Sequence, residues 1–364
     1  MSHHAPAGLR FETHDTFGPL LPEWEALARA TRNVFATAEW ASLWWESYGG
    51  SARLRLVGAR SAEGKLVGIV PLVITRVGPV RVARFLGHGM SDLLGPIRAS
   101  DHGVTSPSLL EAALGEIGPQ WDLFLGERLP GGDAWCEAGT SELRRESNMV
   151  LPLSRWPDWD AYVTALSRKL RQQIRHDEKA LAKRHRLRFR MTREASSLPA
   201  DLDTVFALHR ARWEGRSSFV PGETFYRRFA ALALERGWLR LWILEADSRP
   251  VAARYDFEYE GAYHAYNAGR DPAWRKAGVG LVLRAHTMRE AMSGGAAEYR
   301  FLRGGEDYKK RFLTEDAGLV TVARGRTWLG RWAAQAGTLL RNRPRLRRLA
   351  TQLVRRRSPV EMEE

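Results

Sequence analysis

One stretch decides the fold: AYHAYNAGRDPAWRKAGVGLVLRAHTMREAMSGGAAEYRFLRGGEDYKKRF, residues 262–312. It opens with alternating aromatic residues, the period-two pattern of a strand with two differently lined faces. Glycine and proline break this strand from Gly269, and apolar residues then recur at helical spacing over 281–292. A second strand over 298–302 and a short helical segment before Phe312 follow. The stretch therefore predicts strand, glycine-bearing loop, helix, strand and short helix.

The loop before the helix suits an anionic ligand. Gly278 and Gly280 let the backbone approach a ligand closely, and the first turn of a helix presents N–H groups without intrahelical acceptors. The helix dipole and the side chains of Arg275 and Lys276 add positive charge. A diphosphate is the ligand that this combination favours, although an ordinary helix start with two glycines has the same sequence. The spacing is neither a P-loop nor a Rossmann fingerprint.

The pattern Arg275-x-x-Gly278-x-Gly280 resembles the coenzyme A loop of the GNAT acyltransferases. The longer run, from Asn267 to the Gly-Glu-x-Tyr-Lys-x-x-Phe ending at Phe312, is similar to the C-terminal half of a GNAT branch. That branch, the CelD/BcsL-like proteins, is associated with cellulose and exopolysaccharide biosynthesis and is related in fold to the Fem peptidyltransferases. The resemblance implies an α/β (α+β) chain of tandem GNAT-like domains, each a mixed twisted sheet flanked by helices.

The order of the predicted elements also indicates two copies of one architecture. Strand, two helices, three strands, helix and strand are expected over residues 1–150, a degenerate copy, and again over 187–325. We expect a basic connecting helix at 151–186 and an Arg-rich amphipathic tail at 326–364. The first copy has 87–92 in place of the glycine loop, so cofactor binding is expected of the second copy alone.

The resemblance implies acetyl-CoA, or another acyl-CoA, as the co-substrate. In GNAT enzymes the pantetheine arm pairs with the edge of the fourth strand, and the diphosphate lies on the loop that follows. The expected cofactor-binding residues are Tyr266, Asn267, Ala268, Arg275, Lys276, Ala277, Gly278, Val279 and Gly280. No metal is expected, because histidines and acidic residues do not stand at ligand spacing in a convincing context.

Acyl transfer to an amine needs a base for the ammonium proton and a donor for the leaving thiolate. By resemblance Tyr308 is the candidate thiolate donor, although a packing role fits the same residue. The candidate bases are Glu306, His264 and Asp256; the sequence does not choose among them, and we favour the first two. Lys309 lies in the family's Tyr-Lys-x-x-Phe pattern, which implies that it holds an anionic substrate group or a carbonyl oxygen.

The acceptor side is expected on the first helix of the second copy. His209 and Arg212 resemble the family's first-helix pattern, and we place Asp256 and Lys309 with them as substrate-binding candidates. The expected reaction is acylation of an amino group on a sugar, glycan or lipid-linked precursor in envelope or exopolysaccharide synthesis. Two alternatives stay open: a Fem-like transferase that uses aminoacyl-tRNA, and a non-catalytic module that docks to a membrane.

The C-terminal tail carries much of the charge. The chain has a formal net charge of +14, and residues 324–357 contain eleven arginines without a lysine or an acid. Together with Trp328 and Trp332 near its start, this segment has the pattern of an amphipathic helix that lies on an anionic bilayer. The alternative is a packed helix whose arginines are only solvated. Binding to nucleic acid is expected only under the tRNA alternative. No apolar run reaches about 18 residues, so we expect a cytoplasmic protein, with peripheral attachment at the inner membrane face as an option.

Overall fold

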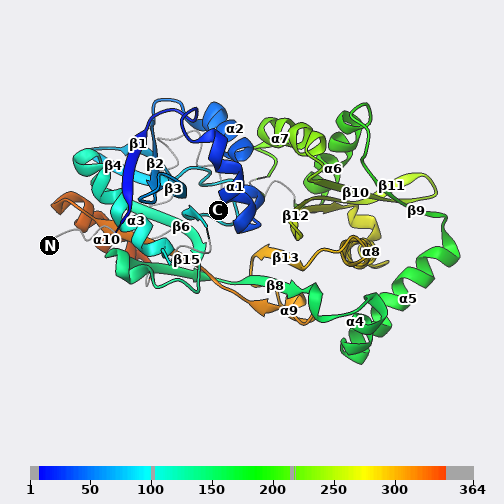
Figure 1. Ribbon diagram of the computed structural model, residues 1–364. Helices are drawn as coiled ribbons and strands as arrows, with labels where there is room; N and C mark the ends of the chain where they lie inside the picture. The colour runs from blue at the N-terminus through cyan, green and yellow to red at the C-terminus, as the bar shows by residue number, and fades with distance from the viewer. Residues whose placement is uncertain (1–7, 100–102, 214–216, 218, 342–364) are drawn as a thin grey trace. The chain divides into compact units, whose positions relative to one another are not determined.

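The computed structural model describes residues 8–99, 103–213, 217 and 219–341 (Figure 1). The chain forms two compact units: one holds the described residues up to Ser147 together with those from Ala317, and the other is Asn148–Asp316. Each unit is built on one mixed β-sheet with helices packed against it. The expected α/β architecture of two mixed sheets flanked by helices is therefore confirmed.

The sheet of the first unit has the strand order β1-β2-β3-β4-β6-β15-β7, with β5 paired to β3. Its strands are β1 (Arg10–His14), β2 (Arg53–Arg60), β3 (Leu66–Val77), β4 (Val80–Phe85), β5 (Ile97–Arg98), β6 (Leu123–Pro130), β7 (Ser141–Glu146) and β15 (Leu319–Gly325). Its α-helices are α1 (Leu21–Thr31), α2 (Ala38–Tyr48), α3 (Ser106–Glu116) and α10 (Trp328–Arg341). Apolar side chains of α3, β3, β4 and β6 form its main core.

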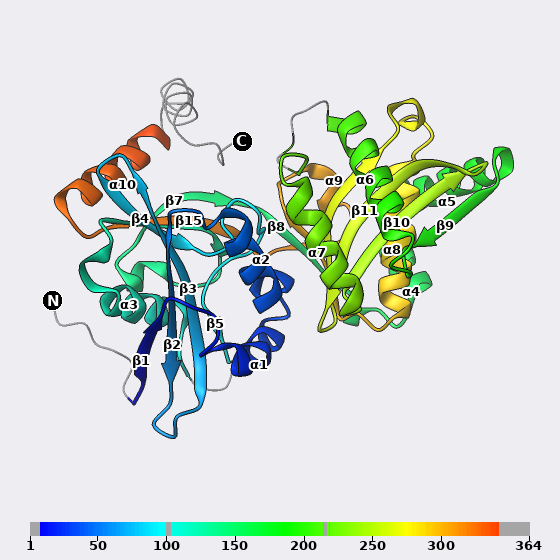
Figure 2. The ribbon, with the colours of Figure 1, turned by 90° about the horizontal axis from the view of Figure 1, so that it is seen from above.

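The sheet of the second unit has the order β14-β8-β13-β12-β11-β10-β9. Its strands are β8 (Asn148–Pro152), β9 (Leu187–Met191), β10 (Leu239–Ala246), β11 (Arg249–Tyr259), β12 (Ala262–Arg270), β13 (Glu298–Arg303) and β14 (Glu315–Asp316). Its α-helices are α4 (Trp159–Ala165), α5 (Arg168–Arg184), α6 (Leu198–Trp213), α7 (Glu223–Glu235), α8 (Val279–Ser293) and α9 (Asp307–Lys310). Helices α6 and α7 lie along one face of this sheet and α8 along the other (Figures 1 and 2).

Each sheet contains a short parallel pair, and this pair positions the site. Strands β12 and β13 pair in parallel from Ala262 with Glu298 to His264 with Arg300, which is three residues of each strand. Strands β4 and β6 of the first unit pair in the same way over three residues. Beyond His264, β12 continues to Arg270 without pairing to β13, so one edge of this strand becomes accessible to other groups.

The observed division differs from the expected ranges in two places. The basic segment expected as one helix over 151–186 is two helices, because Leu166 takes extended backbone and Ser167 starts α5 by accepting a hydrogen bond from Leu170 N at 3.3 Å. Residues 319–325, expected to belong to the domain 187–325, form strand β15, which lies between β6 and β7 of the first unit. Its apolar residues, Val320 and Val322, enter the core of that unit, which explains the placement.

The expected tail, 326–364, falls only in part within the described residues, which end at 341. Helix α10 packs closely through Gly330, where a Cβ atom would collide with the carbonyl oxygen of Asp122. The side chains of Trp328 and Trp332, one turn apart, are 70% and 68% exposed. In the described part of the chain, no helix combines the length and the apolar character needed to cross a membrane.

We predict that Trp328→Ser/Trp332→Ser lowers sedimentation of the full chain with phosphatidylglycerol vesicles by roughly fivefold or more at low salt, because exposed tryptophans anchor amphipathic segments at bilayer interfaces. The matched control, Trp328→Phe/Trp332→Phe, should retain most of the binding. Circular dichroism checks that both variants fold. Equal sedimentation of the serine variant and the parent would contradict an interfacial role for α10.

Candidate functional site

The glycine loop joins β12 to α8 in the second unit. Asp271 ends the strand, and its Oδ1 accepts a hydrogen bond from Ala273 N at 2.9 Å as the chain enters a short 3-10 turn. Gly278 is the N-cap of α8 with φ +74°, the left-handed region that glycine adopts without steric cost. A side chain at this position would also collide with the carboxylate of Asp177 on α5. Backbone shape and packing therefore require glycine here, independently of any ligand.

The first turn of α8 fits a diphosphate on the side of Gly280. A Cβ atom on Gly280 would touch only the Cδ atom of Arg270, at 3.7 Å, so the backbone is accessible there. The N–H groups of Val279 and Gly280 lie in the first helical turn, where the helix itself supplies no acceptor. On the side of Gly278, by contrast, the carboxylate of Asp177 would repel a phosphate.

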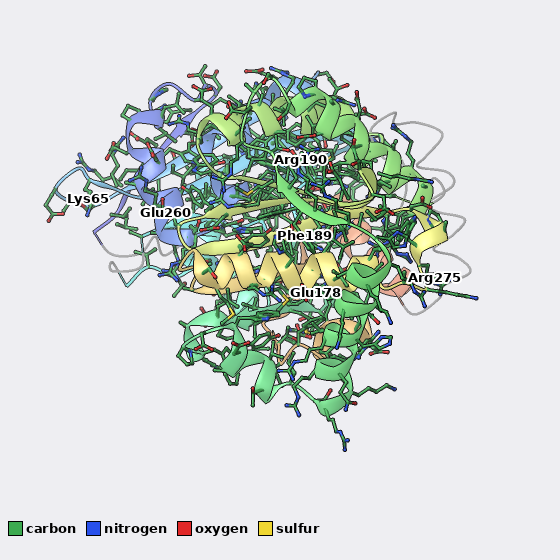
Figure 3. All side chains as sticks on the ribbon, turned by 90° about the vertical axis from the view of Figure 1, so that its right-hand side faces the viewer. Lys65, Glu178, Phe189, Arg190, Glu260 and Arg275 are labelled. Atoms are coloured by element: carbon green, nitrogen blue, oxygen red, sulfur yellow. The ribbon has the colours of Figure 1, made fainter. Side chains whose placement is uncertain are left out.

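The other loop residues surround this turn. Arg275 and Lys276 are exposed, and Figure 3 shows Arg275 at the periphery of the second unit. Ala277 packs on the apolar cluster formed by β10, β11 and α8. The two basic side chains can therefore turn toward an anion at the helix start, whereas Ala277 supports the loop from beneath.

Two of the three expected cofactor contacts on β12 are already engaged by the protein. The carbonyl oxygen of Ala268 accepts hydrogen bonds from Nδ1 of His209 at 3.2 Å and from Nη1 of Arg212 at 3.3 Å. The backbone N–H of Tyr266 donates to Oδ1 of Asp256 at 2.9 Å. The structure thus brings the two candidates from α6 onto the strand that was expected to bind the cofactor. Asn267 is half-buried and pairs in register with β11.

Asp256 lies wholly buried at the point where β11 and β12 shift register. Its carboxylate accepts hydrogen bonds from Nε of Arg254 at 2.5 Å and from the hydroxyl of Tyr263 at 3.2 Å, in addition to the N–H of Tyr266. Burial would lower the pKa of Arg254, but the neighbouring carboxylate more than offsets this and raises that pKa above its ordinary value. Asp256 is held as an internal acceptor, which does not suit a base that must meet an incoming amine.

Of the other two candidate bases, only Glu306 reaches solvent. His264 is fully buried, with Nδ1 3.0 Å from the carbonyl oxygen of Ala262, and burial lowers the pKa of its imidazole well below the usual range. The side chain of Glu306 is 50% exposed and forms an ion pair with Lys309 at 2.8 Å. Burial would raise the pKa of Glu306, but the hydrogen bond and the positive charge of Lys309, with smaller contributions from its surroundings, together outweigh it and lower that pKa, so the carboxylate is ionised and can accept a proton.

Lys309 is directed at the chain's own carbonyl groups. Its side chain is buried, and Nζ donates to the carbonyl oxygens of Arg303 at 2.6 Å and Gly304 at 3.2 Å. The connection that it holds is sharply bent, since Leu302 has φ +59° and Gly304 has φ +109°. Lys309 therefore stabilises the link between β13 and α9, and an anionic substrate would have to compete with these acceptors.

The hydroxyl of Tyr308 accepts a hydrogen bond from the protein and keeps its own proton unused. Its hydroxyl oxygen accepts a hydrogen bond from Nη2 of Arg284 at 3.0 Å, and the guanidinium centre lies 4.7 Å from its ring centroid. Since the oxygen is used as an acceptor, the phenolic proton remains available for donation. Sequence reasoning did not identify Arg284, because its position resembles that of any solvated cation on a helix. The one feature that could have indicated it is its position one turn after Gly280.

His209 is a neutral, oriented histidine. Its side chain is 2% exposed, Nδ1 faces the Ala268 carbonyl, and Nε2 lies 2.7 Å from Oγ of Ser217. The carbonyl can only accept, so Nδ1 carries the proton and Nε2 accepts from the serine. Burial lowers the pKa of His209 to about 4.

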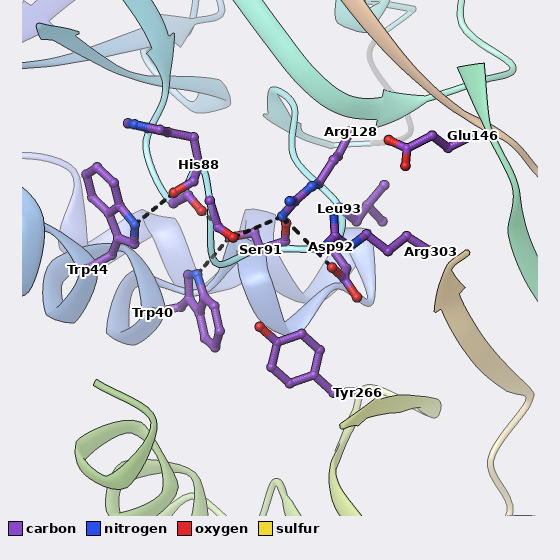
Figure 4. A network of polar contacts seen from close by, with 12 residues as sticks. Trp40, Trp44, His88, Ser91, Asp92, Leu93, Arg128, Glu146, Tyr266 and Arg303 are labelled. Atoms are coloured by element: carbon purple, nitrogen blue, oxygen red, sulfur yellow. Dashed lines mark hydrogen bonds and ion pairs between the residues drawn. The ribbon is translucent and has the colours of Figure 1, made fainter. Parts of the chain in front are cut away.

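The corresponding strand ends of the first unit are filled by protein (Figure 4). After β4 the chain turns through 87–92, and Oγ of Ser91 accepts a hydrogen bond from Nε1 of Trp40 at 2.8 Å. Nη1 of the buried Arg128 donates to the backbone oxygen of Ser91 at 2.5 Å, and Nε1 of Trp44 donates to the backbone oxygen of His88 at 3.2 Å. This packed loop occupies the place where the second unit has its glycine loop.

Residues 168–310 match the acetyltransferase (GNAT) domain family. The chain is similar in structure to FemX, with a TM-score of 0.61 and 12% identity over 85% of this chain and 96% of that one. It is also similar to L-PGS from Bacillus licheniformis (TM-score 0.53, 14% identity, 84% and 96% covered) and to a conserved protein of unknown function from Bacteroides thetaiotaomicron (0.54, 11%, 86% and 99%). A comparison with curated proteins finds no match.

At these identities the likeness to solved structures shows the fold alone. Together with the family match it confirms the expected GNAT-fold acetyltransferase domain, which indicates an acyltransferase. The placement in the CelD/BcsL-like branch stays a prediction.

We predict that Lys309→Met lowers the free energy of unfolding by about 1–3 kcal/mol, because the carbonyl oxygens of 303 and 304 lose their donor in a buried place. Lys310→Met is the matched control, since the side chain of Lys310 is 61% exposed. Urea denaturation measures both variants. A loss no larger than that of the control would refute the structural role of Lys309.

The lowered pKa of His209 predicts a dependence of stability on pH. Between about pH 4 and the ordinary value of 6.5, the unfolded chain binds a proton at this histidine more readily than the folded chain does. The contribution of neutral His209 to the free energy of unfolding is therefore complete above pH 6.5 and is lost as the pH falls toward 4. His209→Gln should reduce the slope of unfolding free energy in this window by up to about 1.4 kcal/mol per pH unit. His176→Gln, whose parent side chain is 79% exposed, serves as the control. An unchanged slope in His209→Gln would contradict the assignment.

Proposed function

We propose that this GNAT-fold chain is an acyl-CoA-dependent N-acyltransferase, with acetyl-CoA as the first candidate donor. The acceptor that we infer is an amino group of a sugar, glycan or lipid-linked precursor in envelope or exopolysaccharide synthesis. One observation carries the proposal: the accessible first turn of α8 at Gly280 follows, after a short loop, a strand whose edge is unpaired with its neighbour beyond His264. A diphosphate and a pantetheine arm need these two features together.

Tyr308 and Glu306 would carry the proton transfers in this reaction. The amine nitrogen bonds to the acyl carbon while the carbon–sulfur bond breaks. Glu306, ionised and open to solvent, takes the proton that leaves the nitrogen. Tyr308, whose oxygen already accepts from Arg284, donates its proton to the departing sulfur.

A Fem-like transfer from aminoacyl-tRNA is the second candidate. It is favoured by the contacts of Ala268, because His209 and Arg212 take the carbonyl oxygen where a pantetheine arm was expected to pair. The likeness to FemX in fold is compatible with it. A non-catalytic module that docks to a membrane through α10 is the third candidate, and the exposed Trp328 and Trp332 are its support.

Thermal-shift measurements with acetyl-CoA, longer acyl-CoAs, free CoA and aminoacyl-tRNA separate these candidates. A ligand at 100 times its Kd should stabilise the folded chain by about 2.7 kcal/mol. A shift with acetyl-CoA and not with aminoacyl-tRNA supports the first candidate, and the reverse result supports the second. No shift with either supports the third.

We predict that Gly280→Asp weakens acetyl-CoA binding by roughly tenfold or more while the chain stays folded, because a carboxylate over the first turn repels the diphosphate yet suits a helix N-terminus. Gly280→Ala, which meets only Arg270 Cδ at 3.7 Å, should bind with smaller loss. Isothermal titration measures both. This position is a cleaner test than Gly278, where φ +74° and the contact with Asp177 make any side chain disruptive.

If Gly280→Asp binds acetyl-CoA as tightly as the parent, the diphosphate does not lie on this turn and the acyl-CoA proposal loses its main support.

A further inference from the structure

Three partly buried arginines, which we name the arginine cluster, lie around the released edge of β12: Arg212 on α6, Arg270 at the end of β12, and Arg284 on α8. Arg212 reaches the backbone at Ala268, two residues before Arg270. Arg284 lies between the rings of Tyr308 and Phe301, with its guanidinium centre 4.7 Å and 5.4 Å from their centroids. The cluster therefore borders the group that we assign to proton donation.

The cluster differs from three other arginines of this unit in forming no direct ion pair in the part of the chain that the structure describes. Arg190, Arg227 and Arg254 each form an ion pair with an aspartate or glutamate. Within the described residues, no carboxylate forms an ion pair with any member of the cluster. Burial first, and then repulsion from Arg270 and Arg284, lower the pKa of Arg212 to about 10. The repulsion between positive charges that are held close together decreases when an anion binds between them.

The cluster and the glycine loop offer different places for an anion. Arg284 follows Gly280 by four residues, a rise of about 6 Å along the helix, and it contacts Tyr308 rather than the loop. Arg270 approaches Gly280 and so borders both places. A diphosphate bound at the first turn of α8 would use the backbone beside Arg270, which leaves Arg212 and Arg284 able to bind a second anionic group.

We propose that Arg212 and Arg284 bind an anionic group, a phosphate or a carboxylate, that the amine acceptor itself carries. Guanidinium groups suit both anions, because their paired N–H donors match two oxygen atoms. The inference rests on the proposed function in one respect, that the bound anion belongs to the acceptor of an acyl transfer. It narrows the proposed acceptor to an amine that carries a phosphate or a carboxylate near the reacting nitrogen.

Isothermal titration with small amines tests the proposal without acyl-CoA. The probes are ethanolamine, phosphoethanolamine and β-alanine, which differ in the anion that accompanies the amine. We expect the parent chain to bind at least one anionic probe about tenfold more tightly than ethanolamine, as paired charge-assisted hydrogen bonds allow. A preference for phosphoethanolamine identifies a phosphate, and a preference for β-alanine identifies a carboxylate.

Arg284→Met and Arg212→Met should each abolish this preference, whereas Arg188→Met, whose parent side chain on β9 is 69% exposed, should keep it as the matched control. Acetyl-CoA titrated into the same variants separates the inference from the proposed function. Loss of the anion preference with acetyl-CoA binding retained supports both. If the parent keeps the preference but does not bind acetyl-CoA, the proposed function fails and the anion site stands. Equal binding of the three probes, or a preference that survives both substitutions, would overturn the inference. The cluster would then be assigned to binding the phosphates of the cofactor.

Discussion

A buried carboxylate at a strand irregularity sets the shape of the site. Asp256 accepts the backbone N–H of Tyr266, so β12 must depart from regular pairing with β11 at this point. The charge is tolerated because Arg254 lies against it and the hydroxyl of Tyr263 adds a third type of donor. Removing either partner of such a pair leaves an uncompensated buried charge, which costs several kcal/mol. Further along β12, the carbonyl of Ala268 is bound by His209 and Arg212 of α6.

The cations of the second unit fall into two kinds, and their partners distinguish them. Lys309 has its donors satisfied by carbonyl oxygens and by Glu306, so its charge is used to hold the chain. Arg212 and Arg284 have polar neighbours but form no ion pair with a carboxylate within the part that the structure describes, so they remain able to bind an added anion. The sequence pattern around these residues does not reveal this difference, whereas the hydrogen-bond and ion-pair partners of each side chain do.

The sequence was sufficient for the local elements that carry strong periodicity. The strand, loop and helix over 262–292 were expected and are present, because alternating aromatics, glycines and helical spacing point to one arrangement. Strand β7 was not expected, since its sequence, Ser141–Glu146, is charged and has no apolar face. The arginine cluster and the partners of Lys309 could not be predicted either, because both depend on which strand edge and which carbonyls the fold places beside those side chains.

The pairing of β6 with β15 joins segments that are made at very different times. Asn148–Asp316 forms a compact unit that is contiguous in the chain. The sheet of the other unit contains strands from before and after this segment, so it is complete only when β15 has been made. During synthesis β6 therefore has an unsatisfied edge until Leu319–Gly325 leaves the ribosome. Unpaired strand edges promote association with other chains, so the nascent protein carries an association-prone edge until the segment that completes this sheet has been made.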